Sequence, residues 1–163
     1  MSRLFASLFG VGFLKPAPGT WGSLAALPLA FGILMLGGPW LLVIVSVIVW
    51  IAGLLSARVV IATGGDHDPS WVVIDEVVGQ WIALVPVAYG AQRMSADLLA
   101  LWPGWVAAFV LFRLFDIWKP WLVGRADRRG DAFGLMMDDV WAGLFAALGV
   151  IVLAGLAHGV LMR

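Results

Sequence analysis

Five apolar stretches, separated by short segments rich in Gly, Pro or charge, limit what this sequence of 163 residues can fold into. About 20 apolar residues cross a bilayer as a helix, so the second, fourth and fifth stretches are long enough and the first is adequate with its flanks. The third is short and contains Pro86, and it spans only if its helix begins earlier, near Val72. The stretches are Trp21–Leu36, Trp40–Ala62, Val77–Tyr89, Leu98–Phe115 and Val140–Val160.

The composition agrees with a membrane protein. Hydrophobic residues make up 63%, charged residues make up 12%, and the mean hydropathy is +1.01, which is more apolar surface than a soluble domain can bury. We therefore expect an all-α fold, a polytopic membrane helical bundle with about five apolar segments, or four if the third is not a full span. The bundle is expected to form a single domain over residues 1–163, with cytoplasmic loops forming the site.

Local features add to this outline. The letters "GGP" at residues 37–39 predict a tight hairpin between the first two stretches. The absence of cysteine excludes disulfides, thiolate metal sites and a cysteine nucleophile. The net charge is zero and there is no basic stripe interleaved with aromatic residues, so we expect no nucleic-acid partner.

The positive charges predict which side of the membrane each loop faces. With five spans, the N-terminus and the loops near residues 63–76 and 116–139 share one side of the membrane. Cytoplasmic loops carry an excess of Lys and Arg. The first side holds eight of the ten: Arg3, Lys15, Arg58, Arg113, Lys119, Arg125, Arg128 and Arg129. We expect this side to be cytoplasmic, and every acid except Asp97 lies on it.

Two pairs of adjacent acids stand directly against apolar runs: Asp75 and Glu76 in "IDEVVG", and Asp138 and Asp139 in "DDVWAG". Ionised side chains are costly there unless they are paired or bind a cation. Carboxylate oxygens at a membrane surface suit Mg²⁺, which commonly bridges to a phosphate of the substrate. Capping of a helix by Asp138 or Asp139 is the alternative interpretation.

A glycine follows one acid of each pair by four residues, Gly79 after Asp75 and Gly143 after Asp139. Residues four apart share a helix face, and small residues let membrane helices approach closely. We therefore expect both acidic pairs to be drawn toward one bundle axis.

Two further segments carry candidate substrate-binding residues. In "KPAPGTWGSLAALP", a helix N-terminus after Lys15 offers backbone N–H groups to an anion, with Thr20 or Ser23 as its cap. An ordinary capped turn is the alternative there. In "FRLFDIWKPW", Asp116 and Lys119 are three residues apart at a helix end, where one turn can present both to the same ligand.

These motifs together resemble the phosphatidylglycerophosphatase A family of Mg²⁺-dependent bacterial membrane enzymes. The resemblance runs from "PAPGTWGSLAA" through "HDPSWVVIDEVVGQW" and "FRLFDIWKPW" to "FGLMMDDVWAG". It implies a multi-pass protein of the bacterial inner membrane that hydrolyses phosphatidylglycerophosphate to phosphatidylglycerol and phosphate. The chain departs from the family at Leu122, where a second Pro is common, and in "GDAFG" around Asp131. The motif positions are Asp68, Asp75, Glu76, Asp116, Lys119, Asp138 and Asp139, with Gly19, Thr20, Gly22 and Ser23.

Hydrolysis of a phosphate monoester depends mainly on charge neutralisation and positioning. We hypothesise three groups of residues for this chemistry. The metal ligands are Asp75, Glu76, Asp138 and Asp139; the phosphate-binding residues are Lys15, Gly19, Thr20, Gly22 and Ser23; the catalytic residues are Asp68, Asp116 and Lys119. Either Asp68 or Asp116 is the expected base for an attacking water, and an aspartyl-phosphate intermediate is the alternative.

Two other functions compete with this hypothesis. A cation transporter or channel also gathers acids among helices, but it places ionisable residues near the bilayer midplane. Here the centres of the apolar stretches are almost uncharged. A phosphatase of another lipid phosphate is the second alternative, because the choice of substrate follows from the resemblance alone.

Overall fold

A computed structural model describes residues 2–64 and 69–161, and over these residues the chain forms helices and no strand. The expected all-α class is confirmed. The helices are α1 (Ser2–Ala6), α2 (Pro18–Gly64), α3 (Ile74–Met94), α4 (Trp102–Trp118), α5 (Leu122–Asp127) and α6 (Ala132–Leu161), with 3-10 turns at Val11–Phe13 and Leu99–Leu101.

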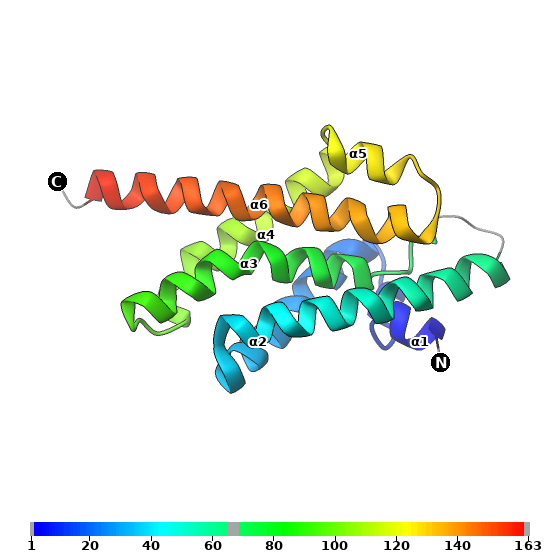
Figure 1. Cartoon of the computed structure of the whole chain (residues 1–163), viewed down its shortest axis with the longest axis horizontal. Coiled ribbons are helices and arrows are strands. Elements are labelled where there is room, and N and C mark those ends of the chain that lie inside the picture. The colour runs from blue at the N-terminus through cyan, green and yellow to red at the C-terminus, as the bar shows by residue number, and fades with distance from the viewer. Residues whose placement is uncertain (1, 65–68, 162–163) are drawn as a thin grey trace.

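Helix α2 folds back on itself in the middle of its length. Its backbone leaves the helical conformation at Gly37 and Gly38, and Gly38 has a φ of 66°, which glycine adopts without a steric penalty. The two arms, 18–36 and 39–64, run in opposite directions (Figure 1). The hairpin predicted from "GGP" is therefore confirmed.

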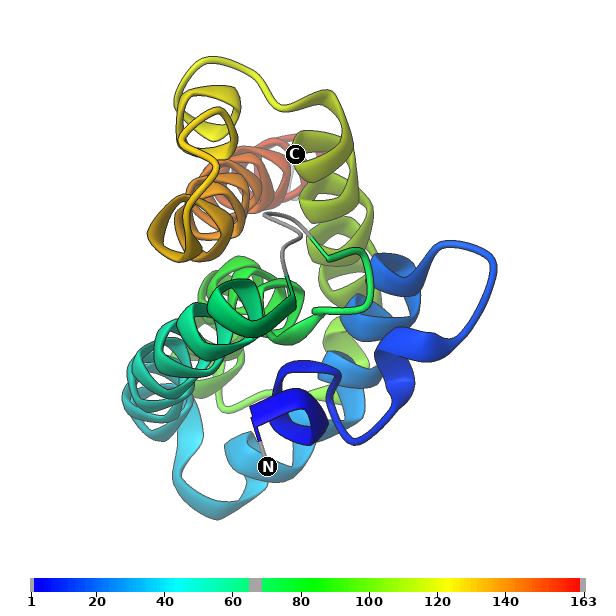
Figure 2. The same ribbon diagram turned by 90° about the vertical axis from the view of Figure 1, so that its right-hand side faces the viewer.

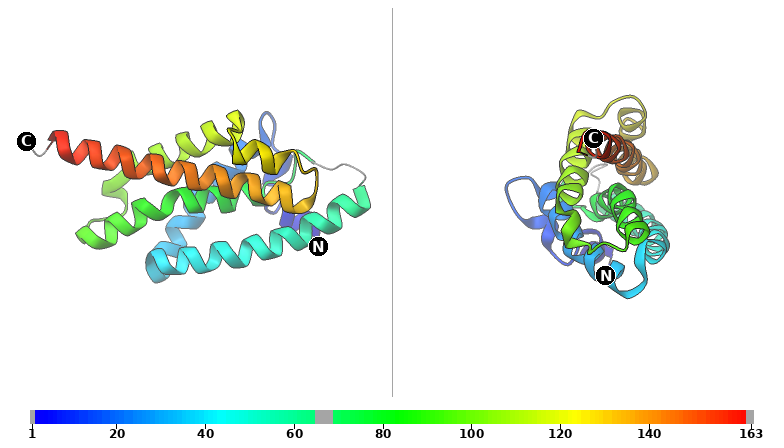
Figure 3. Two further views of the ribbon diagram at one scale, coloured as in Figure 1. Left: turned by 45° about the horizontal axis from the view of Figure 1, so that its top comes forward. Right: turned by 90° about the vertical axis from the view of Figure 1, so that its left-hand side faces the viewer.

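The long helical segments lie along one axis of the molecule and alternate in direction (Figures 1 and 3). One end of the bundle, on the right in Figure 1, collects the end of α2, the starts of α3 and α6, the end of α4, and α5. We call this the site end. The turn at Gly37 and Gly38, the connection from α3 to α4 and the end of α6 lie at the far end. The loops thus alternate between the two ends as the sequence predicted.

Helix α3 is the centre of the bundle. It contacts α2, α4 and α6, which surround it in the end-on view of Figure 2. The Trp81 indole N–H donates to the Ala26 carbonyl at 2.9 Å and ties α3 to the first arm of α2. Gly22 of the same arm packs against Val73, where a Cβ on Gly22 would lie 2.8 Å from the Val73 Cβ. These contacts fix the start of α3 against α2.

Much of the outer surface is apolar. Large side chains on the second arm of α2, on α4 and on α6 are about half exposed or more, among them Ile44, Ile48, Leu55, Val106, Val110, Leu148 and Val152. Segments Pro18–Thr63 and Ala132–Gly159 are long and apolar enough to cross a membrane. These two apolar helices indicate membrane association. Helices α3 and α4 do not qualify as spans by length and composition, so the expectation of five spans is not confirmed.

The last long helix begins earlier than its apolar stretch. Helix α6 starts at Ala132, so Asp138 and Asp139 lie well inside the helix, and the alternative that either caps it is wrong. The cap is Asp131, whose carboxylate accepts from the Gly134 N–H at 2.6 Å. The hydrogen bond from Arg129, with that of Gly134, lowers the pKa of Asp131 below its usual value.

Candidate functional site

A polar cavity of about 240 Å³ lies at the site end of the bundle. Its ionisable lining comes from the first turn of α3, the end of α4, α5 and the start of α6, and the first turn of α2 closes one side. The charged lining residues are Asp75, Glu76, Arg113, Asp116, Lys119, Asp127, Asp131, Asp138 and Asp139. The structure therefore brings together six of the seven sequence-predicted catalytic and metal-binding residues.

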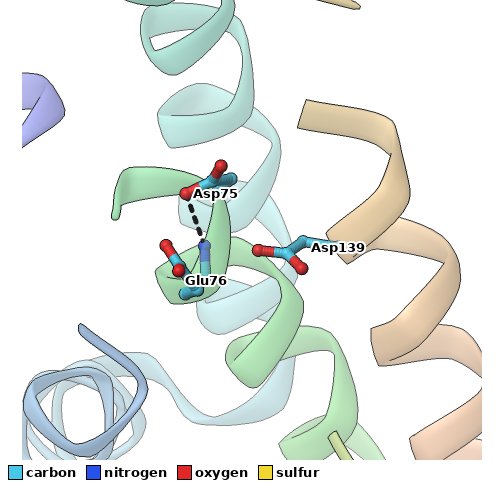
Figure 4. A group of neighbouring side chains, drawn as sticks. All are labelled: Asp75, Glu76 and Asp139. Carbon is cyan, nitrogen blue, oxygen red and sulfur yellow. Dashed lines mark hydrogen bonds between the residues drawn. The ribbon is translucent and has the colours of Figure 1, made fainter. Parts of the chain in front are cut away.

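Three carboxylates from two helices form the centre of the cavity. Asp75 and Glu76 belong to the first turn of α3, and Asp139 reaches toward them from α6 (Figure 4). One carboxylate oxygen from each residue lies within 4.8 Å of the other two. Asp75 and Asp139 are 7% and 3% exposed, so the charges are almost shielded from solvent.

This carboxylate cluster lacks partners for part of its oxygens. Asp75 accepts from the Glu76 N–H at 3.0 Å, but Glu76 Oε2 and Asp139 Oδ1 are buried without a hydrogen-bond partner in the described part of the chain. Buried charges without a partner cost several kcal/mol. A divalent cation with a preference for oxygen ligands satisfies such a set, and the residues therefore fit Mg²⁺.

The two helices that carry the cluster touch one turn below it. A Cβ on Gly79 would clash with the Phe112 ring and lie 2.7 Å from the Asp139 carbonyl oxygen, and a Cβ on Gly143 would lie 2.5 Å from the Gly79 carbonyl oxygen. The expectation that the Asp–Gly spacing draws both pairs of acids to one axis is confirmed.

Asp138 has a different environment from Asp139. Its carboxylate accepts from Lys119 Nζ at 3.2 Å, and Lys119 also forms an ion pair with Asp127 at the end of α5. Burial by itself lowers the pKa of Lys119, but the hydrogen bonds and negative charges of Asp127 and Asp138 outweigh it and raise that pKa above its usual value. Lys119 therefore stays a cation and joins the ends of α4 and α5 to α6.

Arg113 is a site residue that sequence reasoning counted only as a loop charge. It lies one turn before Asp116, forms an ion pair with it at 2.6 Å, and lines the cavity. The Arg113 Nε is buried without a hydrogen-bond partner among the described residues. Its position inside the apolar stretch Leu98–Phe115, three residues before a motif acid, is the sequence signal that could have identified it.

The N-terminal motif is only partly in the cavity. Gly19 lines it, because a Cβ there would clash with Glu76 Oε1 and lie 3.1 Å from an Arg113 amino nitrogen. Ser23 is buried below and donates to the Gly19 carbonyl at 2.8 Å. Since α2 begins at Pro18, the expectation that Thr20 or Ser23 caps it is wrong.

The other sequence-predicted residues lie apart from the cavity lining. Lys15 is exposed, while Thr20 is half-buried and Gly22 packs on α3. Asp68, the alternative base, falls outside the described residues, although Ser70 shortly after it lines the cavity. Gln80 was not predicted. It is fully buried one turn below Glu76, and both polar atoms of its side chain lack partners within residues 2–64 and 69–161.

Comparisons with known proteins bear on this arrangement. The family model described as phosphatidylglycerophosphatase A matches residues 4–154. The chain is 37% identical to the phosphatidylglycerophosphatase A of Haemophilus influenzae, covering 91% of this chain and 85% of that protein. It is 37% identical to the phosphatidylglycerophosphatase A of Escherichia coli, covering 94% and 83%.

A third relative carries a different name. A protein of Bacteroides thetaiotaomicron named as a candidate phosphatidylinositol-3-phosphatase is 36% identical over 91% of each chain. No solved structure matches this chain.

Proposed function

Since the chain belongs to the phosphatidylglycerophosphatase A family and is a phosphatase of phosphatidylglycerophosphate in phospholipid biosynthesis, we propose that its cavity performs this hydrolysis with Mg²⁺. The observation that carries the proposal is the buried carboxylate cluster of Asp75, Glu76 and Asp139, two of whose oxygens lack a partner among the described residues. Asp138 lies beside the cluster and accepts a hydrogen bond from Lys119.

The metal requirement follows from the charges of cavity and substrate. A phosphate monoester carries up to two negative charges, and it would meet three carboxylates, of which Asp75 and Asp139 are buried and Glu76 is partly buried. When bound there, Mg²⁺ would neutralise negative charge on the phosphoryl oxygens and lower the pKa of a water molecule. The all-oxygen donor set agrees with this ion.

The cationic side chains of the cavity bind and orient the phosphate. Lys119 presents its ammonium group beside Asp138, and Arg113 presents a planar guanidinium beside Asp116. A guanidinium matches the geometry of phosphate oxygens. We assign phosphate binding first to these two residues, with Gly19 allowing close approach and with Lys15, Thr20, Gly22 and Ser23 in outer positions.

The proton of the attacking water passes to a carboxylate. Asp116 lines the cavity next to Asp139 and is held by Arg113, so we assign it as the base, with Asp68 as the alternative. The water oxygen forms the new bond to phosphorus as the bond to the glycerol oxygen breaks. The glycerol oxygen then takes up the proton that Asp116 received from the water and leaves as the hydroxyl of phosphatidylglycerol.

The position in the membrane is part of the proposal. The two arms of α2, with α3, α4 and α6, form five spans of the bacterial inner membrane, and the site end faces the cytoplasm. The alternation of the helices along one axis and the excess of Lys and Arg near the site end support this arrangement.

Phosphate release by the purified protein in detergent tests the mechanism. We expect turnover of phosphatidylglycerophosphate with Mg²⁺, none in EDTA, and recovery when Mg²⁺ is restored. Asp139→Asn, which keeps the shape of the side chain, is expected to lose at least about a hundredfold in kcat. Equal turnover in EDTA would overturn the metal proposal, and a fully active Asp139→Asn would remove that residue from the site.

A further inference from the structure

A second cavity lies on the outer side of the bundle between the end of α4 and the middle of α6. It has a volume of about 710 Å³ and its lining is almost entirely apolar. We call it the α4–α6 groove. Its walls include Phe115, Trp118 and Trp121 on one side and Phe145, Leu148 and Val152 on the other. The volume falls in the range of about 300–1,000 Å³ that is typical of small-molecule sites.

The groove and the active-site cavity are joined by one residue. Lys119 lines both. Its ammonium group pairs with Asp127 and Asp138 in the polar cavity, so its aliphatic stem is the part that borders the groove. A ligand that touches both sides of Lys119 must combine a negatively charged group with a hydrocarbon part.

The walls of the groove are open to the surroundings of the bundle. Trp121 is 86% exposed, and Leu148 and Val152 are each 60% exposed. Half-exposed apolar side chains cover much of the bundle, so the groove is distinguished by its volume and by its border with Lys119 rather than by exposure alone. Its place directly beside the phosphate-binding cavity makes the hydrocarbon of the substrate itself the fitting occupant.

We propose that the α4–α6 groove seats an acyl chain of the lipid substrate, and that Lys119 marks the boundary between head group and chain. This inference rests on the proposed function and adds to it the place of the diacylglycerol part. Moving an acyl chain from the bilayer into the groove gains little free energy, because lipid tails are as apolar as the groove. The bound chain instead helps to position the substrate. The seat holds the terminal phosphate in line with the carboxylate cluster.

A second apolar groove gives a natural comparison. It has a volume of about 240 Å³, lies between the second arm of α2, α3 and α6, and includes Val47 and Trp50. It shares no lining residue with the active-site cavity. A chain seated there would have no connection to Lys119, so this groove serves as the control.

Groove-filling variants test the proposal. Leu148 lies ten residues beyond Asp138 on α6, or about 15 Å along the helix, which hexanoyl chains are too short to reach. We compare Leu148→Trp and Val152→Trp with wild type, using phosphatidylglycerophosphate that carries oleoyl or hexanoyl chains. For each variant we measure kcat/KM with the long-chain lipid and divide it by kcat/KM with the short-chain lipid. This ratio should fall by about tenfold in both variants, because a bound substrate that is misplaced by about 1 Å can react up to about a hundredfold more slowly.

Two matched variants separate this effect from a general one. Ile151→Trp changes a residue of α6 that is 55% exposed and does not line the groove, and Val47→Trp fills the second groove. Both should change the ratio by less than about twofold, and thermal unfolding in detergent should show that all four variants fold. An unchanged ratio in Leu148→Trp and Val152→Trp, or an equal change in Val47→Trp, would overturn the proposal.

A binding experiment decides the matter even without hydrolysis. Phosphatidylglycerophosphate with a photoreactive diazirine at the end of one chain should label residues 115–121 and 145–152 of the wild-type protein. Phosphatidylglycerol with the same chain should label them at least about threefold less, because it lacks the terminal phosphate that the cavity binds. Equal labelling by the two lipids means that bulk lipid fills the groove, which contradicts the proposal. Absence of hydrolysis with selective labelling would count against the proposed function alone.

Discussion

Gly143 of α6 lies directly against the backbone of Gly79 of α3, so that a Cβ on Gly143 would be 2.5 Å from the Gly79 carbonyl oxygen. Asp75 and Asp139 stand four residues before these glycines, one turn nearer the site end. The distance between the carboxylates therefore depends on how closely the two helices can approach here.

A methyl group at this crossing should separate the carboxylates. We expect Gly143→Ala to destabilise the protein by about 1–3 kcal/mol and to weaken Mg²⁺ binding, because α3 and α6 must move apart. Gly155→Ala on the same helix is the matched control, since a Cβ there meets nothing within 4 Å. Thermal unfolding and the Mg²⁺ dependence of kcat measure both effects. Full activity at wild-type Mg²⁺ affinity in Gly143→Ala would contradict the role of the crossing.

Removal of one carboxylate charge from the cluster should raise the thermal stability relative to wild type without Mg²⁺ and lower it relative to wild type with Mg²⁺. Asp139→Asn eliminates a buried charge that has an oxygen without a partner in the described chain, so in EDTA we expect a melting temperature above that of wild type. Ligand at about a hundred times Kd adds about 2.7 kcal/mol to the stability of wild type, and the variant should gain little from the same Mg²⁺ concentration. Asp97→Asn, an exposed acid at the far end, should respond to Mg²⁺ like wild type. If Asp139→Asn melted at a lower temperature than wild type in EDTA, the claim that Asp139 carries a destabilising buried charge would be contradicted.

Lys119 should contribute to both stability and activity. Lys119→Met leaves Asp138 without its cation, and we expect a loss of about 1–2 kcal/mol, less than for a fully buried pair because Lys119 is about one-third exposed. The double variant Lys119→Met, Asp138→Asn should recover part of the stability but none of the activity. A double-mutant cycle of unfolding free energies, with phosphate release as the second measurement, tests this. Strict additivity of the two changes would show that the pair is not coupled.

Cysteine labelling can establish the sidedness of the bundle, because the chain has no cysteine of its own. Asp131→Cys is at the site end and Ser95→Cys is at the far end, and both positions are exposed. In intact bacterial cells, a membrane-impermeant maleimide should label Ser95→Cys, and Asp131→Cys should react only after the cells are opened. Labelling of both variants from outside would exclude the five-span arrangement.

The names of the relatives point to two lipid substrates, and the activity of this chain on each can be compared. We expect kcat/KM for phosphatidylglycerophosphate to exceed that for phosphatidylinositol 3-phosphate by at least about tenfold. A cavity of about 240 Å³ accepts a phosphate on a glycerol arm more easily than one on an inositol ring. Phosphate release from each lipid in mixed micelles measures the ratio, and a ratio below one would reassign the substrate.

Local sequence patterns predicted the parts of this structure that depend on one helix at a time. The Asp–Gly spacing correctly placed Asp75 and Asp139 above a close crossing, and "GGP" correctly placed the turn of α2. Both depend on helical periodicity or backbone conformation, which neighbouring residues determine.

Relations between helices were harder to predict. Adjacent residues point about 100° apart around a helix, so Asp139 meets α3 while Asp138 meets Lys119, and this division depends on how α6 is rotated against α4. The start of α6 at Ala132 was missed because Asp138 and Asp139 interrupt its apolar sequence and its cap, Asp131, resembled a loop acid. Arg113 was missed because its approach to Gly19 appears only when α2 and α4 are packed together, although its ion pair with Asp116 lies within α4.

The crossing of Gly79 and Gly143 divides α3 into a short arm and a long arm. The carboxylates lie four residues from it, about 6 Å along each helix, whereas Met94 at the far end of α3 lies fifteen residues away, or about 22 Å. If the helices tilt about this point, a displacement at the far end of the bundle reaches the carboxylates reduced by about fourfold. The short lever arm would therefore limit how far such a tilt disturbs the carboxylate cluster.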